Sequence, residues 1–195
     1  EKGIPIDYIT GTSAGALIGA LYASGYSPTE IENYVLGKKF QNMTQGNLMK
    51  KQQFFFLKPE DDVSVVDIPF AKDSTLLKSL PTNFISSVLL DYEMMKTLGT
   101  TSASYQDNFD NLFVPFRCVA SDIANKESIV FKKGKLNLAV RASMTYPFFI
   151  SPIAIDGKLL FDGGLYNNFP IDVMYHDFNA DYIVGSNVSS NATKP

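Results

Sequence analysis

The 195-residue chain has few of the residues that build metal sites, disulfides and histidine-based active sites. Its one cysteine, Cys118, cannot form a disulfide within the chain, and the apolar segment around it suits a buried thiol. Its one histidine, His176, belongs to no cluster at metal-ligand spacing, and no glycine-rich loop precedes a Lys-Ser/Thr pair. The residues therefore predict neither a metal nor an organic cofactor.

Long apolar runs and an excess of positive charge are also absent. No run approaches the roughly 20 apolar residues that cross a membrane. The net charge of -3 and the sequence pI of about 5.1 give no electrostatic footprint for nucleic acid. We interpret the one basic cluster, around Gly134, as a solvated hairpin tip. Hydrophobic residues at 45% and charged residues at 19% are ordinary for a single globular domain.

Apolar segments typical of strands alternate with segments of helical spacing. Strands are expected at residues 6–10, 113–122, 127–136 and 181–188, with a hairpin at 153–161 that turns at Asp156-Gly157. Helices are expected at residues 14–24, 27–36, 136–144 and 170–178, and over much of 81–98. The second of these helices begins with a capping box, in which Ser27 and Glu30 satisfy each other's backbone. This alternation predicts an α/β fold with helices covering a largely parallel sheet.

Ser13 lies in the pattern G-x-S-x-G, between a predicted strand and a predicted helix. That context is typical of a nucleophile elbow, a tight turn that presents a serine hydroxyl at the end of a sheet. Gly11 and Gly15 avoid the clashes that larger neighbours would make in the turn. The backbone N–H of Ala14 and the helix N-terminus would face an oxyanion formed at Ser13. The simpler alternative is a serine that only caps the helix.

A nucleophilic serine needs a base, and two residues are candidates. His176 lies in a helix-like stretch between acidic residues, where a surface histidine is the simpler interpretation. Asp162 follows three apolar residues at the end of a predicted strand, and Gly163 and Gly164 then let the backbone turn closely past another group. The position places a carboxylate at the sheet edge where Ser13 is expected. An Asp-Gly pair is also a common turn signal.

The segment GTSAGA, followed far downstream by DGG, resembles the patatin-like phospholipase family. The likeness extends in the same order through VPFRCVASD, AVRASMTYPFF, DGKLLFDGGLYNNFPIDV and ADYIVGSNV. It covers residues 1–37 and 113–188, whereas residues 41–112 are variable and only loosely similar. The resemblance implies a three-layer α/β/α patatin-like catalytic domain over residues 1–188 and a polar tail or linker at 189–195.

The family's active site is a Ser–Asp dyad, so the resemblance implies Ser13 as nucleophile and Asp162 as base. Ser13 would attack an ester carbonyl and form an acyl-enzyme, and Asp162 would activate the water that releases the fatty acid. A free aspartate, with a pKa of about 3.9, must be partly desolvated to serve as a base. The apolar neighbours expected to desolvate it are Leu160, Phe161, Leu165 and Tyr166.

The implied substrate is a phospholipid or other acyl-ester lipid met at a membrane surface, with hydrolysis or acyl transfer as the reaction. The Phe54–Leu57 run and the Met94-Met95 pair either meet lipid, as part of a lid, or belong to the core. The family's glycine-rich oxyanion loop would precede Glu1. The resemblance favours a bacterial protein of the cell envelope, possibly fused to an outer-membrane barrel, or a secreted one, with a cytoplasmic esterase as the alternative.

Two other functions stay open at this point. One is a non-catalytic patatin-fold binding domain of a larger envelope protein, against which the presence of both Ser13 and Asp162 argues. The other is an α/β-hydrolase esterase that uses His176 as its base, because the chain order Ser13, Asp162, His176 matches that fold.

Overall fold

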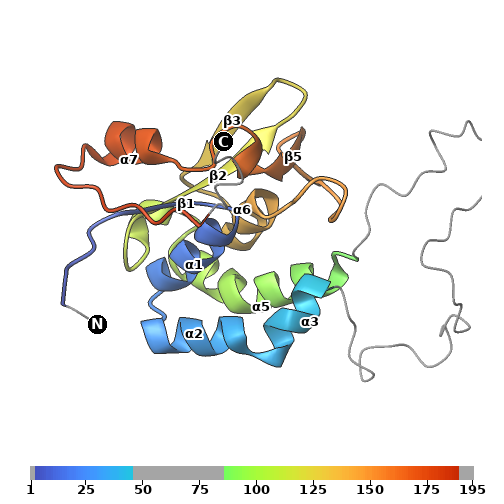
Figure 1. Ribbon diagram of the computed structural model, residues 1–195, viewed down its shortest axis with the longest axis horizontal. Coiled ribbons are helices and arrows are strands. Elements are labelled where there is room, and N and C mark those ends of the chain that lie inside the picture. Colours follow the sequence, from blue (N-terminus) through green and yellow to red (C-terminus); the bar gives the residue numbers. More distant parts are fainter. Residues whose placement is uncertain (1–2, 46–85, 189–195) are drawn as a thin grey trace, which may run out of the picture.

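The computed structural model describes residues 3–45 and 86–188, which form one mixed sheet with helices on both faces (Figure 1). The strands are β1 (Ile9–Thr12), β2 (Phe116–Asp122), β3 (Glu127–Phe131), β4 (Ile153–Ile155) and β5 (Lys158–Asp162). The helices are α1 (Ala14–Ala23), α2 (Pro28–Leu36), α3 (Lys38–Gln45), α5 (Val88–Ser104), α6 (Leu136–Ser143) and α7 (Ile171–Phe178). Within these ranges, no helix has the length and apolarity needed to cross a membrane.

The strand β2 is the centre of the sheet, and its seven residues are all buried. β1 pairs with its first half in parallel, with Thr12 opposite Val119. β5 pairs with its second half in antiparallel orientation, with Asp162 opposite Ala120. Because β3 pairs with residues 118–122 and overlaps both, β1 and β5 must share the other edge of β2. The C-terminal ends of β1 and β5 therefore meet head to head at the middle of β2.

The predicted α/β class is confirmed, but the expectation of a largely parallel sheet is wrong for the described strands. Only the pair β1–β2 is parallel, and the pairs β2–β3, β2–β5 and β4–β5 are antiparallel. The connections give the physical reason for two of these pairs, because β3 follows β2 after a turn and β5 follows β4 after a two-residue turn. Such short links join antiparallel strands, whereas a parallel pair needs a long crossover.

Helices cover both faces of the sheet, as the three-layer prediction requires. Phe116 and Cys118 are fully buried on the face that carries α1, α5 and α6. The helices α1 and α5 lie below the strands in Figure 1. The intervening Arg117 points to the other face, where its guanidinium lies 4.5 Å from the ring centre of Phe178 in α7. Phe178 also stacks on Tyr8, with ring centres 4.4 Å apart. Strand alternation thus sends Phe116 and Cys118 to one layer and Arg117 to the other.

Several local predictions are confirmed by the backbone. The Ser27 side chain accepts a hydrogen bond from the Glu30 N–H, and the Glu30 side chain accepts one from the Ser27 N–H, which completes the capping box of α2. Asp156 and Gly157 both have positive φ, 50° and 77°, in the tight turn between β4 and β5. Cys118 is a buried free thiol.

Other local predictions fail or fall elsewhere. The strand predicted at 181–188 is not formed, because none of the described strands pairs with these residues. The basic cluster around Gly134 joins β3 to α6, so the hairpin interpretation is wrong. Of the methionine pair, Met94 is buried in the core and Met95 is exposed. The Phe54–Leu57 run and the predicted tail at 189–195 lie outside the described residues.

Candidate active site

Ser13 occupies the turn between β1 and α1 in a strained backbone conformation. Its φ is 55° and its ψ is -122°, values that a residue with a side chain rarely adopts. Such a conformation costs on the order of 1–3 kcal/mol and persists where the surroundings hold it. The side chain makes no capping bond to the helix, so the interpretation of Ser13 as a simple helix cap is wrong. The hydroxyl is instead presented away from the turn, as a nucleophile elbow requires.

The two glycines of the G-x-S-x-G pattern have different surroundings. A Cβ placed on Gly11 would lie 2.4 Å from the Gly15 carbonyl oxygen, so only glycine fits there. A Cβ on Gly15 would meet nothing within 4 Å. The steric reason predicted for both positions therefore holds for Gly11 and is wrong for Gly15. Gly15 and Ala14 are exposed in the first turn of α1, where helix geometry leaves their N–H groups without intrahelical acceptors.

The Ser13 hydroxyl donates a hydrogen bond directly to Asp162, across 149 positions of sequence. The distance from Ser13 Oγ to Asp162 Oδ2 is 2.6 Å, short for an O–H···O bond and typical of one to a carboxylate. The sheet explains the contact, since Thr12 and Asp162 end their strands beside neighbouring residues of β2. The two residues that the sequence singled out as nucleophile and base are thus brought together.

Backbone contacts hold the Asp162 carboxylate in place. Its second oxygen, Oδ1, accepts a hydrogen bond from the Gly164 N–H at 2.7 Å. A Cβ on Gly163 would lie 2.2 Å from the Val119 carbonyl oxygen, and one on Gly164 would lie 2.8 Å from Asn168 Oδ1. The prediction that both glycines let the chain pass close to another group agrees with these distances. The turn therefore needs glycine at 163, where the neighbour is backbone, whereas at 164 the nearest atoms are side-chain oxygens of Asn168 and Asp162.

Burial dominates the electrostatics of the site. Asp162 is only 5% exposed, and this desolvation raises the pKa of its carboxyl above the ordinary value, although the bonds from Ser13 and Gly164 act in the opposite direction. Of its predicted apolar neighbours, Leu160 is buried and Leu165 lines the adjoining pocket. Burial also raises the pKa of the Cys118 thiol to about 12, which leaves that residue un-ionised near neutral pH. Asp162 is therefore a better candidate than Cys118 for the base that takes the proton of Ser13.

A buried arginine braces the strand that carries Asp162, and sequence reasoning missed it. Arg141 donates to Asp91 Oδ1 at 2.5 Å, to Thr145 Oγ1 at 2.5 Å and to the Ser151 carbonyl at 2.9 Å. The Thr145 carbonyl in turn accepts from the Asp162 N–H at 2.8 Å. The sequence did carry a signal for this role. Arg141 is the one charged residue in the apolar helical segment 136–144, and an arginine buried there must find several hydrogen-bond acceptors.

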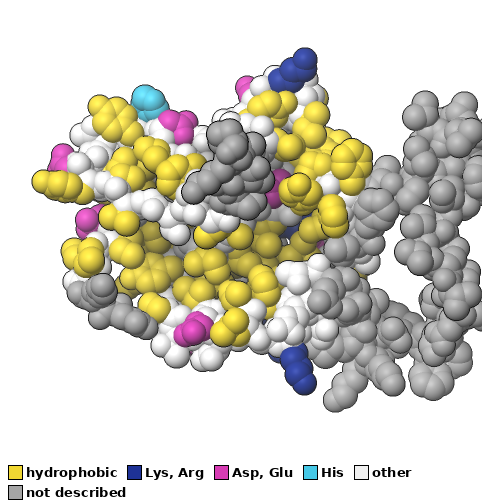
Figure 2. Space-filling view, viewed as in Figure 1, with side chains coloured by type: hydrophobic (Ala, Val, Ile, Leu, Met, Phe, Trp, Pro, Cys, Tyr) yellow, Lys and Arg dark blue, Asp and Glu magenta, His cyan; other side chains and the backbone are white. Residues whose placement is uncertain are grey.

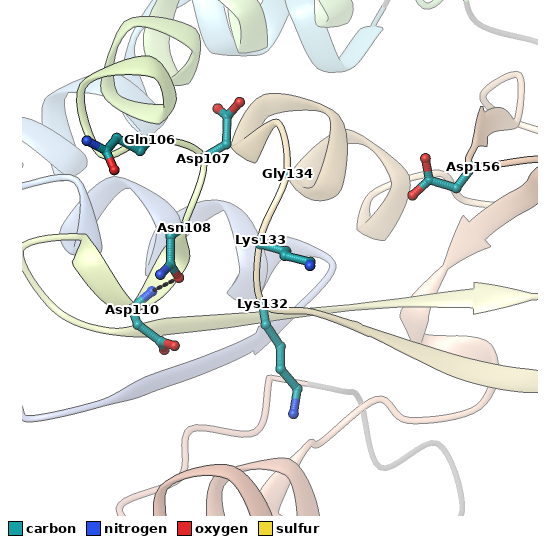
Figure 3. A pocket seen from close by; sticks show the side chains of 8 residues that line it. All are labelled: Gln106, Asp107, Asn108, Asp110, Lys132, Lys133, Gly134 and Asp156. Atoms are coloured by element: carbon teal, nitrogen blue, oxygen red, sulfur yellow. Dashed lines mark hydrogen bonds between the residues drawn. The ribbon is translucent and has the colours of Figure 1, made fainter.

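The dyad opens into a pocket of about 280 Å³, whose lining includes Tyr146, Pro147, Leu165 and Asn168. A larger hollow of about 550 Å³ lies elsewhere, between the loop after α5, the end of β3 and the β4–β5 turn (Figure 3). Three of its charged residues already have ion-pair partners. Lys132 Nζ lies 2.8 Å from an Asp177 oxygen, Asp110 Oδ1 lies 2.6 Å from Arg117 Nη1, and Asp107 Oδ2 lies 2.7 Å from Lys135 Nζ. The smaller pocket, which holds the bonded serine and carboxylate, is therefore the candidate active site.

His176 is not part of this site. It is exposed on α7, and its ring lies edge-on to Tyr175 with centres 5.6 Å apart. The Ser13 hydroxyl bonds to the carboxylate itself, without an imidazole between them. In the described part of the chain, no three His, Cys, Asp or Glu side chains are grouped to hold a metal ion. The chemistry available at the pocket is that of a serine beside a desolvated carboxylate, at a helix N-terminus.

Residues 1–175 match the family described as Patatin-like phospholipase, and the chain belongs to that family. It is 29% identical to Neuropathy target esterase sws of Drosophila melanogaster, over 97% of this chain and 11% of the relative. It is 28% identical to Lysophospholipase NTE1 of Scheffersomyces stipitis, over 97% of this chain and 10% of the relative. It is 30% identical to Patatin-like phospholipase domain-containing protein 6 of Homo sapiens, over 89% of this chain and 10% of the relative. The chain thus spans about a tenth of the length of these relatives.

These relatives come from animals and a yeast, and they give no support to the bacterial or barrel-fused detail of the expectation. Placement in the cell envelope or outside the cell stays a prediction, with the cytoplasm as its alternative. The predicted domain limit at residue 188 is likewise untested.

Proposed function

We propose that the chain is the catalytic domain of a serine hydrolase that cleaves acyl esters of phospholipids or related lipids. The observation that carries the proposal is the 2.6 Å bond between Ser13 Oγ and Asp162 Oδ2 in a strained elbow. Backbone strain of this kind is typical of functional sites. The esterase and lysophospholipase names of two relatives point to the same reaction class.

In the proposed mechanism, Asp162 takes the hydroxyl proton as Ser13 Oγ attacks the ester carbonyl carbon. The negative charge that forms on the carbonyl oxygen lies near the N-terminus of α1, which favours anions. The departing alcohol takes the proton from Asp162, and the acyl group stays on Ser13. A water molecule then gives its proton to Asp162 and attacks the acyl carbon, after which Ser13 regains its proton and the fatty acid leaves. An alcohol in place of this water would give acyl transfer.

The surroundings of the pocket support a lipid substrate. Residues 142–155 and 163–171, two segments that contribute to the pocket, contain no charged residue. They carry large side chains that are exposed, namely Tyr146, Phe148, Phe149, Leu165, Tyr166 and Phe169. Figure 2 shows hydrophobic side chains gathered over the segment before β4. Exposed apolar groups of this kind mark binding surfaces, and two of them, Tyr146 and Leu165, line the pocket of the serine, where acyl chains would lie.

The test is reaction with a fluorophosphonate probe, followed by measurement of fatty acid released from phosphatidylcholine and lysophosphatidylcholine micelles. The wild-type protein should be labelled at Ser13 and should release fatty acid, whereas Ser13→Ala should do neither. Labelling without lipid hydrolysis would restrict the proposal to small esters. A folded wild-type protein that is not labelled would overturn the proposal in favour of a binding domain.

The pH dependence of catalysis should report the buried carboxylate. Asp162 acts as a base only when ionised, so kcat/KM should fall as the pH drops through its pKa. Because burial raises that pKa, the acid limb should lie above the ordinary aspartate value of about 3.9. The measurement is kcat/KM for a soluble short-chain ester from about pH 3.5 to about pH 8. A rate that is constant down to pH 4, roughly the ordinary aspartate value, would exclude Asp162 as the base.

Replacement of His176 separates the dyad from a histidine-based triad. His176→Ala should leave kcat/KM unchanged, since the residue is exposed on α7 and outside the pocket. Loss of a general base would instead lower it by about 10²–10⁴-fold. Ester hydrolysis by the variant and the wild type, measured side by side, checks this, and a large loss would refute the dyad.

A further inference from the structure

Ser143, the last residue of α6, connects the nucleophile to the central strand through one hydroxyl. The side chain is fully buried, with 0% exposure. Its Oγ donates a hydrogen bond to the Val119 carbonyl at 2.5 Å and accepts one from the Ser13 N–H at 2.8 Å. A serine hydroxyl has a single proton. Because that proton is donated to the Val119 carbonyl, a lone pair of Oγ accepts the hydrogen bond from the Ser13 amide. The two contacts together determine the orientation of the hydroxyl.

The Ser13 amide needs such an acceptor because of its place in the elbow. It lies at the N-terminus of α1, where no preceding turn of helix offers a carbonyl. A backbone N–H without a partner in a partly buried turn is costly. The bond to Ser143 satisfies this amide and holds the backbone at φ 55°. The same bond commits the Ser13 N–H, so donors to an oxyanion must come from elsewhere, the Ala14 N–H included.

The carbonyl that Ser143 contacts lies where the two halves of the site meet. Val119 pairs with Thr12 at the end of β1, and its neighbour Ala120 pairs with Asp162 at the end of β5. The backbone of Gly163, directly after Asp162, passes so close to the Val119 carbonyl oxygen that a Cβ would lie 2.2 Å from it. The Val119 carbonyl therefore contacts the turn after Asp162 directly and the turn at Ser13 through the Ser143 hydroxyl.

We infer that Ser143 is a positioning residue, whose hydroxyl sets the backbone of Ser13 relative to Val119 and thereby aligns Ser13 Oγ with Asp162. The expected effect on the reaction rate rests on the proposed function, whereas the hydrogen bonds of Ser143 do not. Ser143 touches neither the substrate nor the reacting atoms. Its loss should act on the rate of the chemical step, because a displacement of about 1 Å in a reacting group costs about 100-fold.

The kinetic test compares Ser143→Ala with a matched variant, Ser121→Ala. Ser121 lies on β2 and is equally buried, and among the described residues its hydroxyl has no hydrogen-bond partner. Ser143→Ala should lower kcat for a soluble short-chain ester, and the rate of fluorophosphonate labelling, by about 10- to 100-fold with little change in KM. Ser121→Ala should match the wild type, and Ser143→Thr, which keeps the hydroxyl, should recover most of the rate.

A second measurement on the unaltered protein covers the case in which Ser143→Ala does not fold. The Ser13 amide proton should exchange with solvent more slowly than those of Ala14 and Gly15 in the same turn, because only Ser13 N–H bonds to a buried hydroxyl. Exchange of Ser13 as fast as Ala14, or equal labelling of Ser143→Ala and wild type, would overturn the role of Ser143. A wild type that is not labelled at all would instead overturn the proposed function, while the exchange comparison still tests the contact.

Discussion

Asp162→Asn is expected to lower kcat/KM by about 10²–10⁴-fold, the usual contribution of a general base. Asparagine has nearly the same shape and keeps an oxygen that can accept from the Gly164 N–H. It cannot take a proton from Ser13, because an amide is not a base at neutral pH. Rates of ester hydrolysis and of fluorophosphonate labelling measure the loss. A variant with wild-type rates would show that another group activates the serine.

The same substitution should not weaken the fold, which separates loss of chemistry from loss of structure. Burial raises the pKa of Asp162 above its unfolded value, so the ionised carboxylate costs stability once the pH exceeds that pKa. Asparagine removes this cost. At pH 7, about three units above the ordinary aspartate pKa, the variant should therefore unfold at the same or a higher temperature than the wild type. The difference should vanish in acid, where Asp162 is protonated, and a lower melting temperature at neutral pH would contradict the burial argument.

Gly11→Ala is expected to damage both the fold and the site. The added Cβ would lie 2.4 Å from the Gly15 carbonyl oxygen and 2.7 Å from the Ala16 nitrogen, both backbone atoms of α1. Either the helix or the strand must move, at a cost of about 1–3 kcal/mol of unfolding free energy. The resulting shift of Ser13 should lower fluorophosphonate labelling by about 100-fold. Thermal unfolding and labelling rates measure the two effects.

Gly15→Ala is the matched control for this prediction, since it adds the same methyl group to the other glycine of the pattern. The new Cβ meets nothing within 4 Å, and alanine is better than glycine in a helix by about 0.5–1 kcal/mol. Its melting temperature should equal or exceed that of the wild type. Equal destabilisation by both substitutions would mean that the close approach at Gly11 does not limit the fold.

Features decided by a residue's own chemistry could be predicted from the sequence. Ser27 and Glu30 cap α2 as expected, because their side chains satisfy backbone groups within the same turn. The Asp156-Gly157 turn follows from two residues that tolerate positive φ. The pairing of Ser13 with Asp162 was also foreseen, from the elbow pattern and the family resemblance, and the two are hydrogen-bonded.

Distant contacts that no local motif marks could not be predicted. Residues 181–188 are predicted to form a strand from their apolar run at 182–184, but a strand also needs a partner, and no strand in the described part of the chain pairs with them. The end-to-end meeting of β1 and β5 depends on pairing register along β2, which composition does not encode. Ser143 lies in the predicted helix 136–144, but nothing in that segment indicates its hydrogen bonds, because they reach two backbone groups that are 24 and 130 positions away.

The 149 positions between Ser13 and Asp162 also bear on how the protein is made. Domains are synthesised from the N-terminus, and contacts of high sequence separation close late in folding. A nascent chain that has emerged only as far as α6 contains the serine but not its base, since β5 has yet to be made. Such a chain could not activate the serine. The proposed hydrolysis could therefore begin only after β5 has been synthesised and has paired with β2 beside β1.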